Sequence, residues 1–152
     1  MSEYIQTTVD KFIFRVATDR LYSPAGVWAF WAESQGNGRV RIGLTDYLQQ
    51  LNGDVAFAHV KPIGTKLAVG DEIAELETIK ANVSLFSPVS GTVIEINTNL
   101  EPNPEFINDE PYGKGWLAMV DVADWESERT KLLDPHAYLS AMQLQAEQEL
   151  NG

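Results

Sequence analysis

Lys80 is the residue whose type and surroundings most clearly suggest a reactive site. It lies in the stretch LETIKANV, residues 76–83, between the uncharged residues Ile79 and Ala81. Its amine is either an ordinary solvated charge or a nucleophile to which another enzyme attaches a group. For a lysine taken at random the first alternative is far commoner, because lysines are mostly exposed and solvated. The residue type alone therefore leaves both alternatives open.

Other kinds of reactive site find little support in the sequence. The chain has no cysteine, which excludes disulfides, thiolate metal sites and a cysteine nucleophile. The two histidines, His59 and His136, lack the spacing of a metal site, so we expect both to be structural or solvated. Residues 36–43 imitate a glycine-rich phosphate loop, but Arg41 stands where the third glycine belongs, and we interpret the segment as a hairpin. We expect no metal site and no catalytic machinery in the chain itself.

The charge balance narrows the range of partners. The formal net charge is −11, which repels phosphate backbones and anionic lipid surfaces, so we expect neither a nucleic-acid partner nor a membrane partner. Charged residues are spread through the first thirty positions, and no apolar run is long enough for a signal peptide or a membrane span. The sequence predicts a cytoplasmic protein. Its acidic surface serves either solubility or docking on basic patches of larger partners, where charge mainly speeds the encounter, and the net charge alone does not choose between the two.

The elements that must position Lys80 follow from apolar runs separated by glycine and proline. At 152 residues and 44% hydrophobic composition, the chain has the size and make-up of one globular domain. The apolar runs predict strands at residues 12–16, 27–33, 39–44, 54–60, 72–80, 92–96 and 116–120. The Asn37-Gly38 pair between the second and third of these predicts a tight hairpin turn.

Three helical segments are expected among these strands. Thr45 and Gly53 are placed to cap the two ends of a short helix. Asn103, followed by a proline, predicts a cap and one helical turn. Asp134 precedes a longer C-terminal helix. Its apolar positions recur every three or four residues, at Leu139, Met142, Ala146 and Leu150. Together these patterns predict a mainly β fold, a sandwich or a barrel, with helical decoration.

The strand pattern also constrains where Lys80 lies. If residues 73–80 form a strand, Lys80 shares its side-chain parity with Ala74 and Leu76, which suit the protein interior. A lysine is almost never buried without a partner, so the strand must end before it. We therefore expect Lys80 at a hairpin tip between residues 73–79 and the returning segment 83–86, where a bulky appendage is tolerated.

The residues around Lys80 carry a family resemblance. The segment GDEIAELETIKANVSLFSPVSGTVIEIN, residues 70–97, resembles the lipoyl-lysine hairpin of the glycine cleavage system H protein family, which has an E-S-V-K-A core and then S-P-V-S-G. Residues 38–71 are similar to the family's hairpin, short helix and strand, and residues 103–120 to its N-P-E-L-V-N-x-D-P-Y-G-x-G-W motif. The resemblance covers roughly residues 21–142. It divides the chain into an N-terminal extension, 1–20, a lipoyl carrier domain, 21–142, and a C-terminal helix end and tail, 143–152.

The resemblance implies a fold and a function. The fold is a lipoyl-domain-like barrel-sandwich hybrid with short flanking helices and a C-terminal helix. Lys80 bears lipoate through an amide, and Glu77 and Gly91 match positions that frame the hairpin and its recognition by the lipoate-attaching enzyme. A biotin carrier has methionines on both sides of its lysine, where this chain has Ile79 and Ala81. The protein is then a non-catalytic carrier. Its arm is aminomethylated at glycine decarboxylase, relieved of the one-carbon unit at aminomethyltransferase and reoxidised by dihydrolipoamide dehydrogenase.

Two departures leave alternatives open. The family's H-E-W motif is replaced by Gly26-Val27-Trp28, and the first twenty residues have no counterpart in the family. Lipoate-binding proteins similar to H protein also serve the sulfur-oxidising heterodisulfide-reductase-like complex, so a sulfur carrier is the second hypothesis. The third is an interaction module in which Lys80 stays unmodified.

Overall fold

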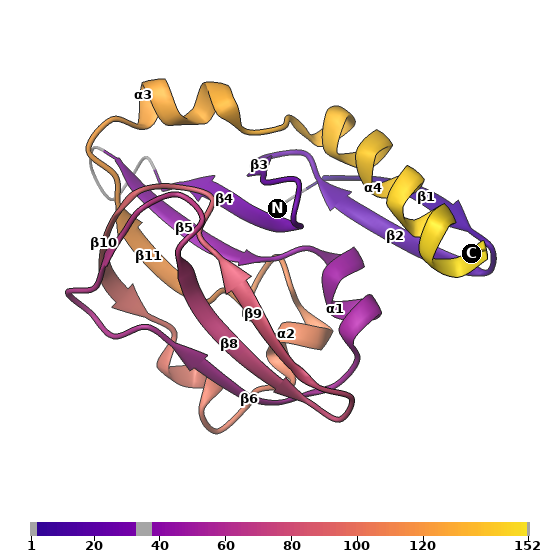
Figure 1. The fold of residues 1–152 in the computed structure, drawn as a ribbon, viewed down its shortest axis with the longest axis horizontal. Coiled ribbons are helices and arrows are strands. Elements are labelled where there is room, and N and C mark those ends of the chain that lie inside the picture. The colour runs from indigo at the N-terminus through magenta and orange to yellow at the C-terminus, as the bar shows by residue number, and fades with distance from the viewer. Residues whose placement is uncertain (1–2, 33–37, 152) are drawn as a thin grey trace.

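The computed structural model describes residues 3–32 and 38–151, which form three β-sheets with helices along their edges (Figure 1). Two of the sheets enclose the main core, and neither closes into a barrel. The third is a two-stranded hairpin that lies beside the C-terminal helix (Figure 1). The expectation of a mainly β fold is confirmed.

The six-stranded sheet is antiparallel throughout, in the order β3-β4-β5-β11-β10-β7. Its strands are β3 (Leu21–Tyr22), β4 (Val27–Trp31), β5 (Arg39–Leu44), β7 (Lys66–Leu67), β10 (Gly91–Ile96) and β11 (Ala118–Asp121). The expected pairing of β4 with β5 is present, with Ala29 opposite Ile42. Most of the turn expected between them lies outside the described residues, since Asn37 is not among them.

The three-stranded sheet contains the hairpin that carries Lys80. Its strands are β6 (Val55–Val60), β8 (Glu72–Thr78) and β9 (Asn82–Phe86), with β8 in the middle. Residues from both large sheets meet in the main core, among them Val27, Val40, Ile42, Leu44, Ile73, Ala74, Leu76, Leu85, Val93 and Val120. Ala74 and Leu76 are fully buried, as the parity of the strand predicts.

The short helices stand close to where the sequence predicts them. In α1 (Asp46–Asn52), the hydroxyl of Thr45 accepts a hydrogen bond from the backbone NH of Leu48, and Gly53 ends the helix with φ +81°. Two further short elements are η2 (Thr98–Leu100) and α2 (Phe106–Asp109).

The expected cap at Asn103 is wrong. Helix α2 begins at Phe106, and its N-cap is Glu105, whose side chain makes no capping bond. The backbone amides of Phe106 and Ile107 instead donate to the carbonyls of Asn103 and Pro104, a tighter i to i+3 pattern. Asn103 therefore supplies its backbone carbonyl to this turn, and the helix starts later than the sequence suggests.

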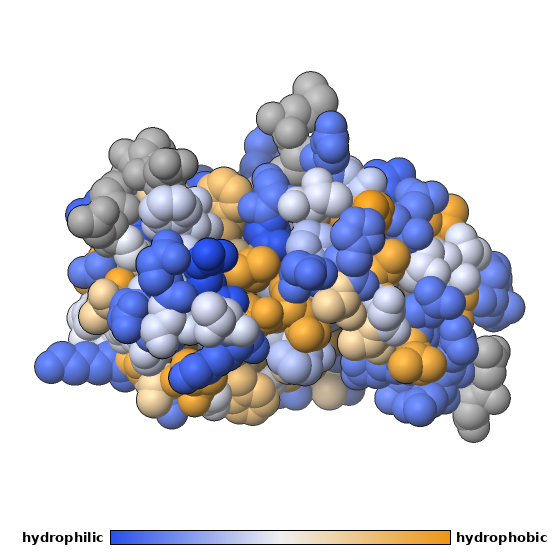
Figure 2. Space-filling model, turned by 90° about the horizontal axis from the view of Figure 1, so that it is seen from above, coloured by the Kyte–Doolittle hydropathy of each residue, from blue (hydrophilic) through white to orange (hydrophobic). Residues whose placement is uncertain are grey.

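The C-terminal part contains two short helical elements that the sequence does not predict and one longer helix that it does. The sequence patterns do not predict α3 (Trp125–Glu128) or η3 (Arg129–Lys131). The longer helix α4 (Pro135–Asn151) begins as predicted, and Asp134 accepts a hydrogen bond from the NH of Ala137. Seen from above, the side of the molecule that bears α3 and α4 is largely hydrophilic, with apolar residues between (Figure 2). No helix in the described ranges has the length and apolar character needed to cross a bilayer.

The N-terminal residues form a hairpin that packs on α4. Strand β2 (Phe12–Ala17) matches the expected strand, and β1 (Tyr4–Val9), which pairs with it, is not predicted by the sequence patterns. Both strands contribute to a second hydrophobic cluster with α1 and α4. Its buried members are Val9, Phe14, Val16, Tyr22, Trp28, Tyr47, Tyr138, Met142 and Ala146. The extension is therefore packed against the rest of the chain.

Candidate functional site

The turn between β8 and β9 is closed by one side chain, that of Thr78. Its hydroxyl donates to the carbonyl of Ala81 at 2.9 Å and accepts from the NH of Ala81 at 3.1 Å. The backbone NH of Thr78 donates to the same carbonyl at 2.9 Å. Threonine hydroxyls commonly close turns in this way. The two residues between them, Ile79 and Lys80, are consequently held outward at the tip.

Lys80 is exposed at this tip, as the sequence predicts. Within the described residues, no salt bridge or hydrogen bond of its amine is found. Its aliphatic stem lies beside the end of α1, because a methyl group placed on Gly53 would be 3.8 Å from the Lys80 Cε. The amine therefore stands at an exposed end of the fold without an acidic partner to hold it.

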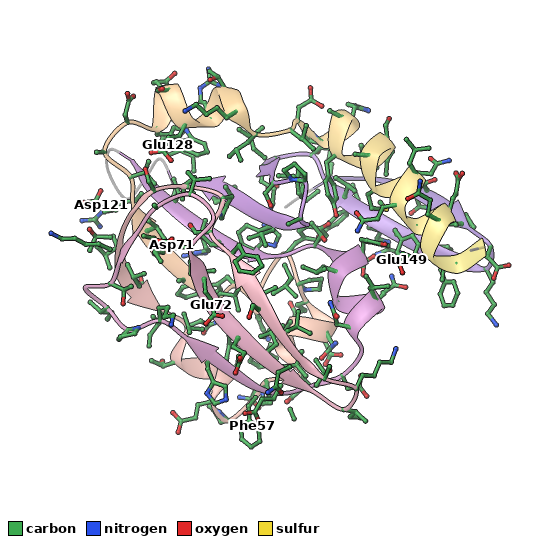
Figure 3. The ribbon with its side chains drawn as sticks, viewed as in Figure 1. Phe57, Asp71, Glu72, Asp121, Glu128 and Glu149 are labelled. Carbon is green, nitrogen blue, oxygen red and sulfur yellow. The ribbon has the colours of Figure 1, made fainter. Side chains whose placement is uncertain are left out.

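Glu77 lies on the outer face of the same hairpin and pairs with a histidine. Its carboxylate is 3.0 Å from Nε2 of His59 on the neighbouring strand β6. Phe57, directly opposite Glu77 in the register, is 58% exposed and stacks on the His59 ring at 6.3 Å between centroids. Figure 3 shows Phe57 projecting from the edge of the molecule. Glu77 and Lys80 thus lie near each other on the exposed end of the hairpin, but no hydrogen bond or salt bridge joins their side chains.

Gly91 lies away from Lys80, at the start of β10. A Cβ at this position would lie 2.2 Å from the backbone oxygen of Asp121 and 2.8 Å from a methyl of Val120. Only glycine allows β10 and β11 to approach this closely. The close packing of β10 against β11 explains why a glycine is needed at position 91. The structure does not bring Gly91 together with Lys80 and Glu77.

A residue that the sequence analysis missed supports the far end of the hairpin. Glu128 of α3 accepts hydrogen bonds from the NH and the hydroxyl of Ser90, at 2.7 and 2.5 Å. Ser87, in the same turn, is buried and donates to the carbonyl of Val89. Figure 3 shows Glu128 on the helix above this turn. Ser90 and Glu128 are 38 residues apart in the sequence, so their contact has no local sequence signal and only the fold reveals it.

The geometry leaves the amine of Lys80 accessible to other molecules. Among the described residues, no three His, Cys, Asp or Glu side chains come together in a way that could hold a metal ion. The chain also has no cysteine to supply thiol chemistry of its own. An exposed amine without a salt bridge, at the tip of a turn closed by Thr78, can be reached by an enzyme that attaches a group to it.

Known proteins with similar sequences identify the family to which the chain belongs. A family model described as glycine cleavage H-protein matches residues 21–145. The glycine cleavage system H protein of Stenotrophomonas maltophilia (strain K279a) is 41% identical over 113 residues, which cover 74% of this chain and 86% of that protein. The protein of the same name from Mycobacterium avium (strain 104) is 43% identical over 111 residues, covering 71% and 84%.

A solved structure agrees with these relatives. The crystal structure of a glycine cleavage system H protein from Mycobacterium marinum superimposes with a TM-score of 0.71 and 29% identity, and covers 81% of this chain and 95% of that chain. These similarities favour the glycine cleavage hypothesis, and nothing in the described residues favours the sulfur-carrier alternative. The chain therefore belongs to the glycine cleavage H-protein family, whose members are non-catalytic carriers of a lipoyl group bound covalently to a lysine.

Proposed function

We propose that Lys80 is the lysine that carries the lipoyl group, and that the protein presents this group in turn to the enzymes of glycine cleavage. The observation that carries the proposal is the position of Lys80 at the tip of the turn closed by Thr78, exposed and without an ion pair in the described chain. Residues 21–142 then form the carrier domain, with residues 1–20 and 143–152 as additions at its ends.

The residues at the tip fit the group that the family carries. Attachment through an amide removes the positive charge of the lysine. Lys80 can lose this charge without leaving a carboxylate unpaired, because it forms no salt bridge within the described residues. When bound, the lipoyl group supplies a disulfide and dithiol pair, which the cysteine-free chain lacks. The protein's own task is to hold the attachment point at the surface and clear of the core. The turn closed by Thr78 places Lys80 in this way.

The outer face of the hairpin is the surface that partner enzymes would meet first. Glu75 and Glu77 lie on this face opposite His59 and Phe57 in the register of β6 and β8. With a net charge of −11, the chain is suited to basic surfaces, where attraction mainly speeds the encounter. The proposed partners are the lipoate-attaching enzyme, glycine decarboxylase, aminomethyltransferase and dihydrolipoamide dehydrogenase.

Intact-mass measurement tests the attachment site. The full chain, incubated with lipoate, ATP and a lipoate-attaching enzyme, should gain the mass of one lipoyl group on the peptide that contains Lys80. The variant Lys80→Arg should gain none and should keep its melting temperature, because an exposed tip lysine contributes little to packing. Lys11→Arg is the matched control, since Lys11 lies in the turn of the β1–β2 hairpin and is also exposed.

The outcomes separate the hypotheses. Lipoylation of the wild type and of Lys11→Arg, but not of Lys80→Arg, supports the proposal. No added mass on the wild type would leave the unmodified interaction module as the better account. Unfolding of Lys80→Arg would show that the lysine has a packing role and is not a simple attachment point.

A further inference from the structure

A groove of about 450 Å³ lies beside β6, which is an edge strand of the three-stranded sheet. Four consecutive residues of this strand, 57–60, line one side of the groove. The opposite side comes from the end of β10 and from η2, through Ile96, Leu100 and Glu101. Figure 1 shows β6 as the outermost strand of its sheet, with no further strand of the described chain beside it. The groove therefore lies along a sheet edge that is open to other molecules.

The backbone of β6 presents hydrogen-bonding groups at this edge. In an antiparallel pair of strands, residues that bond to the partner strand alternate with residues whose NH and carbonyl point the other way. Lys61 donates its NH to a carbonyl of β8 at 2.9 Å, so the alternation makes Ala58 and Val60 residues of the second kind. Within the described residues, no backbone hydrogen bond of either is found on the groove side. Both residues therefore offer a donor and an acceptor to a strand that enters the groove.

Residues 57–60 lack the devices that usually protect an edge strand from pairing. Natural edges are blunted by lysine, by proline or by a bulge. The four side chains here are those of Phe, Ala, His and Val, and Lys61 and Pro62 follow only after the strand has ended. The bulge between Val55 and Phe57 comes before the part that lines the groove. An unprotected edge beside a groove is the arrangement that proteins use to bind a peptide as an added strand.

The groove has apolar walls and is held in shape by hydrogen bonds of the chain itself. The half-buried side chains of Ala58, Val60 and Ile96 line it and also pack against the main core. The segment opposite β6 is anchored by Asn97, whose side-chain amide donates to two backbone carbonyls in the loop before β11, both at 2.8 Å. A site that needs no rearrangement loses less conformational entropy when its ligand binds. Apolar side chains of a peptide find matching surface here.

The charges near the groove favour a basic occupant. Glu101 is exposed and lines the groove. Glu75 and Glu77 lie on the outer face of β8, directly opposite residues of β6 that line it. No lysine or arginine of the described chain lines the groove. A second copy of the chain is disfavoured as the occupant, because two molecules with a net charge of −11 repel each other. The occupant is therefore a partner of opposite charge.

We propose that this groove binds an extended, basic segment of a partner protein, which joins the three-stranded sheet as an additional strand beside β6. The backbone groups of Ala58 and Val60 hold the segment, its apolar side chains enter the groove, and its basic side chains face the nearby carboxylates. The inference goes beyond the proposed function, because it holds for the chain with or without a group on Lys80. It also brings the partner close to the tip, since Glu77, opposite Phe57, is separated from Lys80 by about 10 Å of extended chain.

Amide hydrogen exchange on the full, unmodified chain tests the groove residue by residue. The probe is the hexapeptide Arg-Val-Arg-Val-Arg-Val, acetylated and amidated at its ends, in which basic and apolar side chains alternate. In the free chain we expect fast exchange at Ala58 and Val60 and slow exchange at His59, whose NH faces β8. The bound peptide should slow exchange at Ala58 and Val60 about tenfold or more and leave His59 unchanged. The peptide Glu-Val-Glu-Val-Glu-Val, with the same pattern and the opposite charge, should have no effect.

Variants with a matched control identify the groove as the cause. Glu101→Gln removes a carboxylate from the lining and should weaken the binding of the basic peptide about twofold to fivefold. Glu105→Gln makes the same change at an exposed residue that does not line the groove, and should leave the affinity unchanged. Ala58→Pro deletes the NH that faces the groove and keeps the bonds to β8, so the peptide should no longer protect Val60. Circular dichroism checks that this variant folds, and the two glutamate variants test the groove independently of it.

The results separate the possible occupants. Protection of Ala58 and Val60 by the basic peptide alone, with weaker binding in Glu101→Gln but not in Glu105→Gln, supports the proposal. Unchanged exchange at both amides in excess basic peptide, or equal affinity of the two glutamate variants, would overturn it. If Ala58 and Val60 are already protected in the free chain and sedimentation shows a dimer, then a second copy occupies the edge and the proposal is wrong.

Discussion

At the scale of single residues, Thr78 and Lys80 show what a sequence does and does not reveal. Lys80 could be placed at a hairpin tip because Ala74 and Leu76, which share its parity, had to face the interior, and the structure confirms their burial. The sequence patterns do not single out Thr78, although a threonine just before a turn is a known local signal. The role of Thr78 depends on the residue to which its hydroxyl is hydrogen-bonded. The pairing of β8 with β9 determines that this residue is Ala81.

The first prediction removes the hydroxyl that closes this turn. Thr78→Val loses both side-chain hydrogen bonds to Ala81, so the free energy of unfolding should fall by about 1 kcal/mol. The turn should also hold Lys80 less firmly, and we expect the catalytic efficiency of lipoylation to fall roughly threefold to tenfold. Denaturant unfolding and a timed lipoylation assay measure the two effects.

Thr65→Val is the control for this prediction. The Thr65 hydroxyl donates to the carbonyl of Pro62 at 2.7 Å in another turn, so its loss should have a similar cost in stability. Lipoylation should then proceed at the wild-type rate. Equal slowing in both variants would mean that general loss of stability, and not the turn at Lys80, governs the reaction.

At the scale of elements, the strands follow from local pattern while the contacts between them do not. Strands β4, β6, β8 and β10 arise where apolar runs predict them, and Thr45 and Gly53 cap α1 as their types predict. The family resemblance implies that Gly91 helps to frame the hairpin. Its closest neighbours are Val120 and Asp121 on β11, about thirty residues later, and no local pattern encodes that approach.

The second prediction concerns this approach of β10 to β11. In Gly91→Ala the new methyl would lie 2.2 Å from the Asp121 backbone oxygen, so the two strands must separate. We expect the free energy of unfolding to fall by about 3 kcal/mol, as for other overpacked sites. Gly113→Ala is the control, because its new methyl would come no nearer than 3.5 Å to any atom, and its effect should be small. Equal stability of both variants in denaturant would disprove the packing role of Gly91.

At the scale of the whole molecule, tyrosines join the N-terminal extension to the rest of the chain. Tyr22 donates from its hydroxyl to the carbonyl of Ala17, and Tyr112 donates to that of Arg15. Tyr138 of α4 stacks on Tyr22 at 4.6 Å between centroids. Strand β1 could not be predicted from the sequence because its partners, β2 and the distant helix α4, together create its buried face. The terminal segments are thus integrated through contacts that only the complete fold brings together.

The third prediction uses the ionisation of these tyrosines. Burial is the main cause that raises the pKa of Tyr22, Tyr112 and Tyr138 above the ordinary value of 10.0. In the unfolded chain each ionises near pH 10, while the folded chain keeps its protons, so unfolding releases protons above that pH. Stability should be unaffected by these groups below pH 10 and should fall above it, by up to about 1.4 kcal/mol per pH unit for each tyrosine. Denaturant unfolding at several pH values above and below 10 measures the slope.

Two variants separate the ionisation of Tyr138 from its hydrogen bond. The Tyr138 hydroxyl lies 3.1 Å from that of Thr45, and both Tyr138→Phe and Thr45→Val remove this bond. Each should lower stability at neutral pH by about 1 kcal/mol, with a further loss in Thr45→Val because the α1 cap disappears. Only Tyr138→Phe deletes a proton that unfolding would release, so only this variant should show a shallower fall of stability above pH 10. If its slope equals that of Thr45→Val, then Tyr138 does not stay protonated in the fold, and alkaline unfolding must begin elsewhere in the molecule.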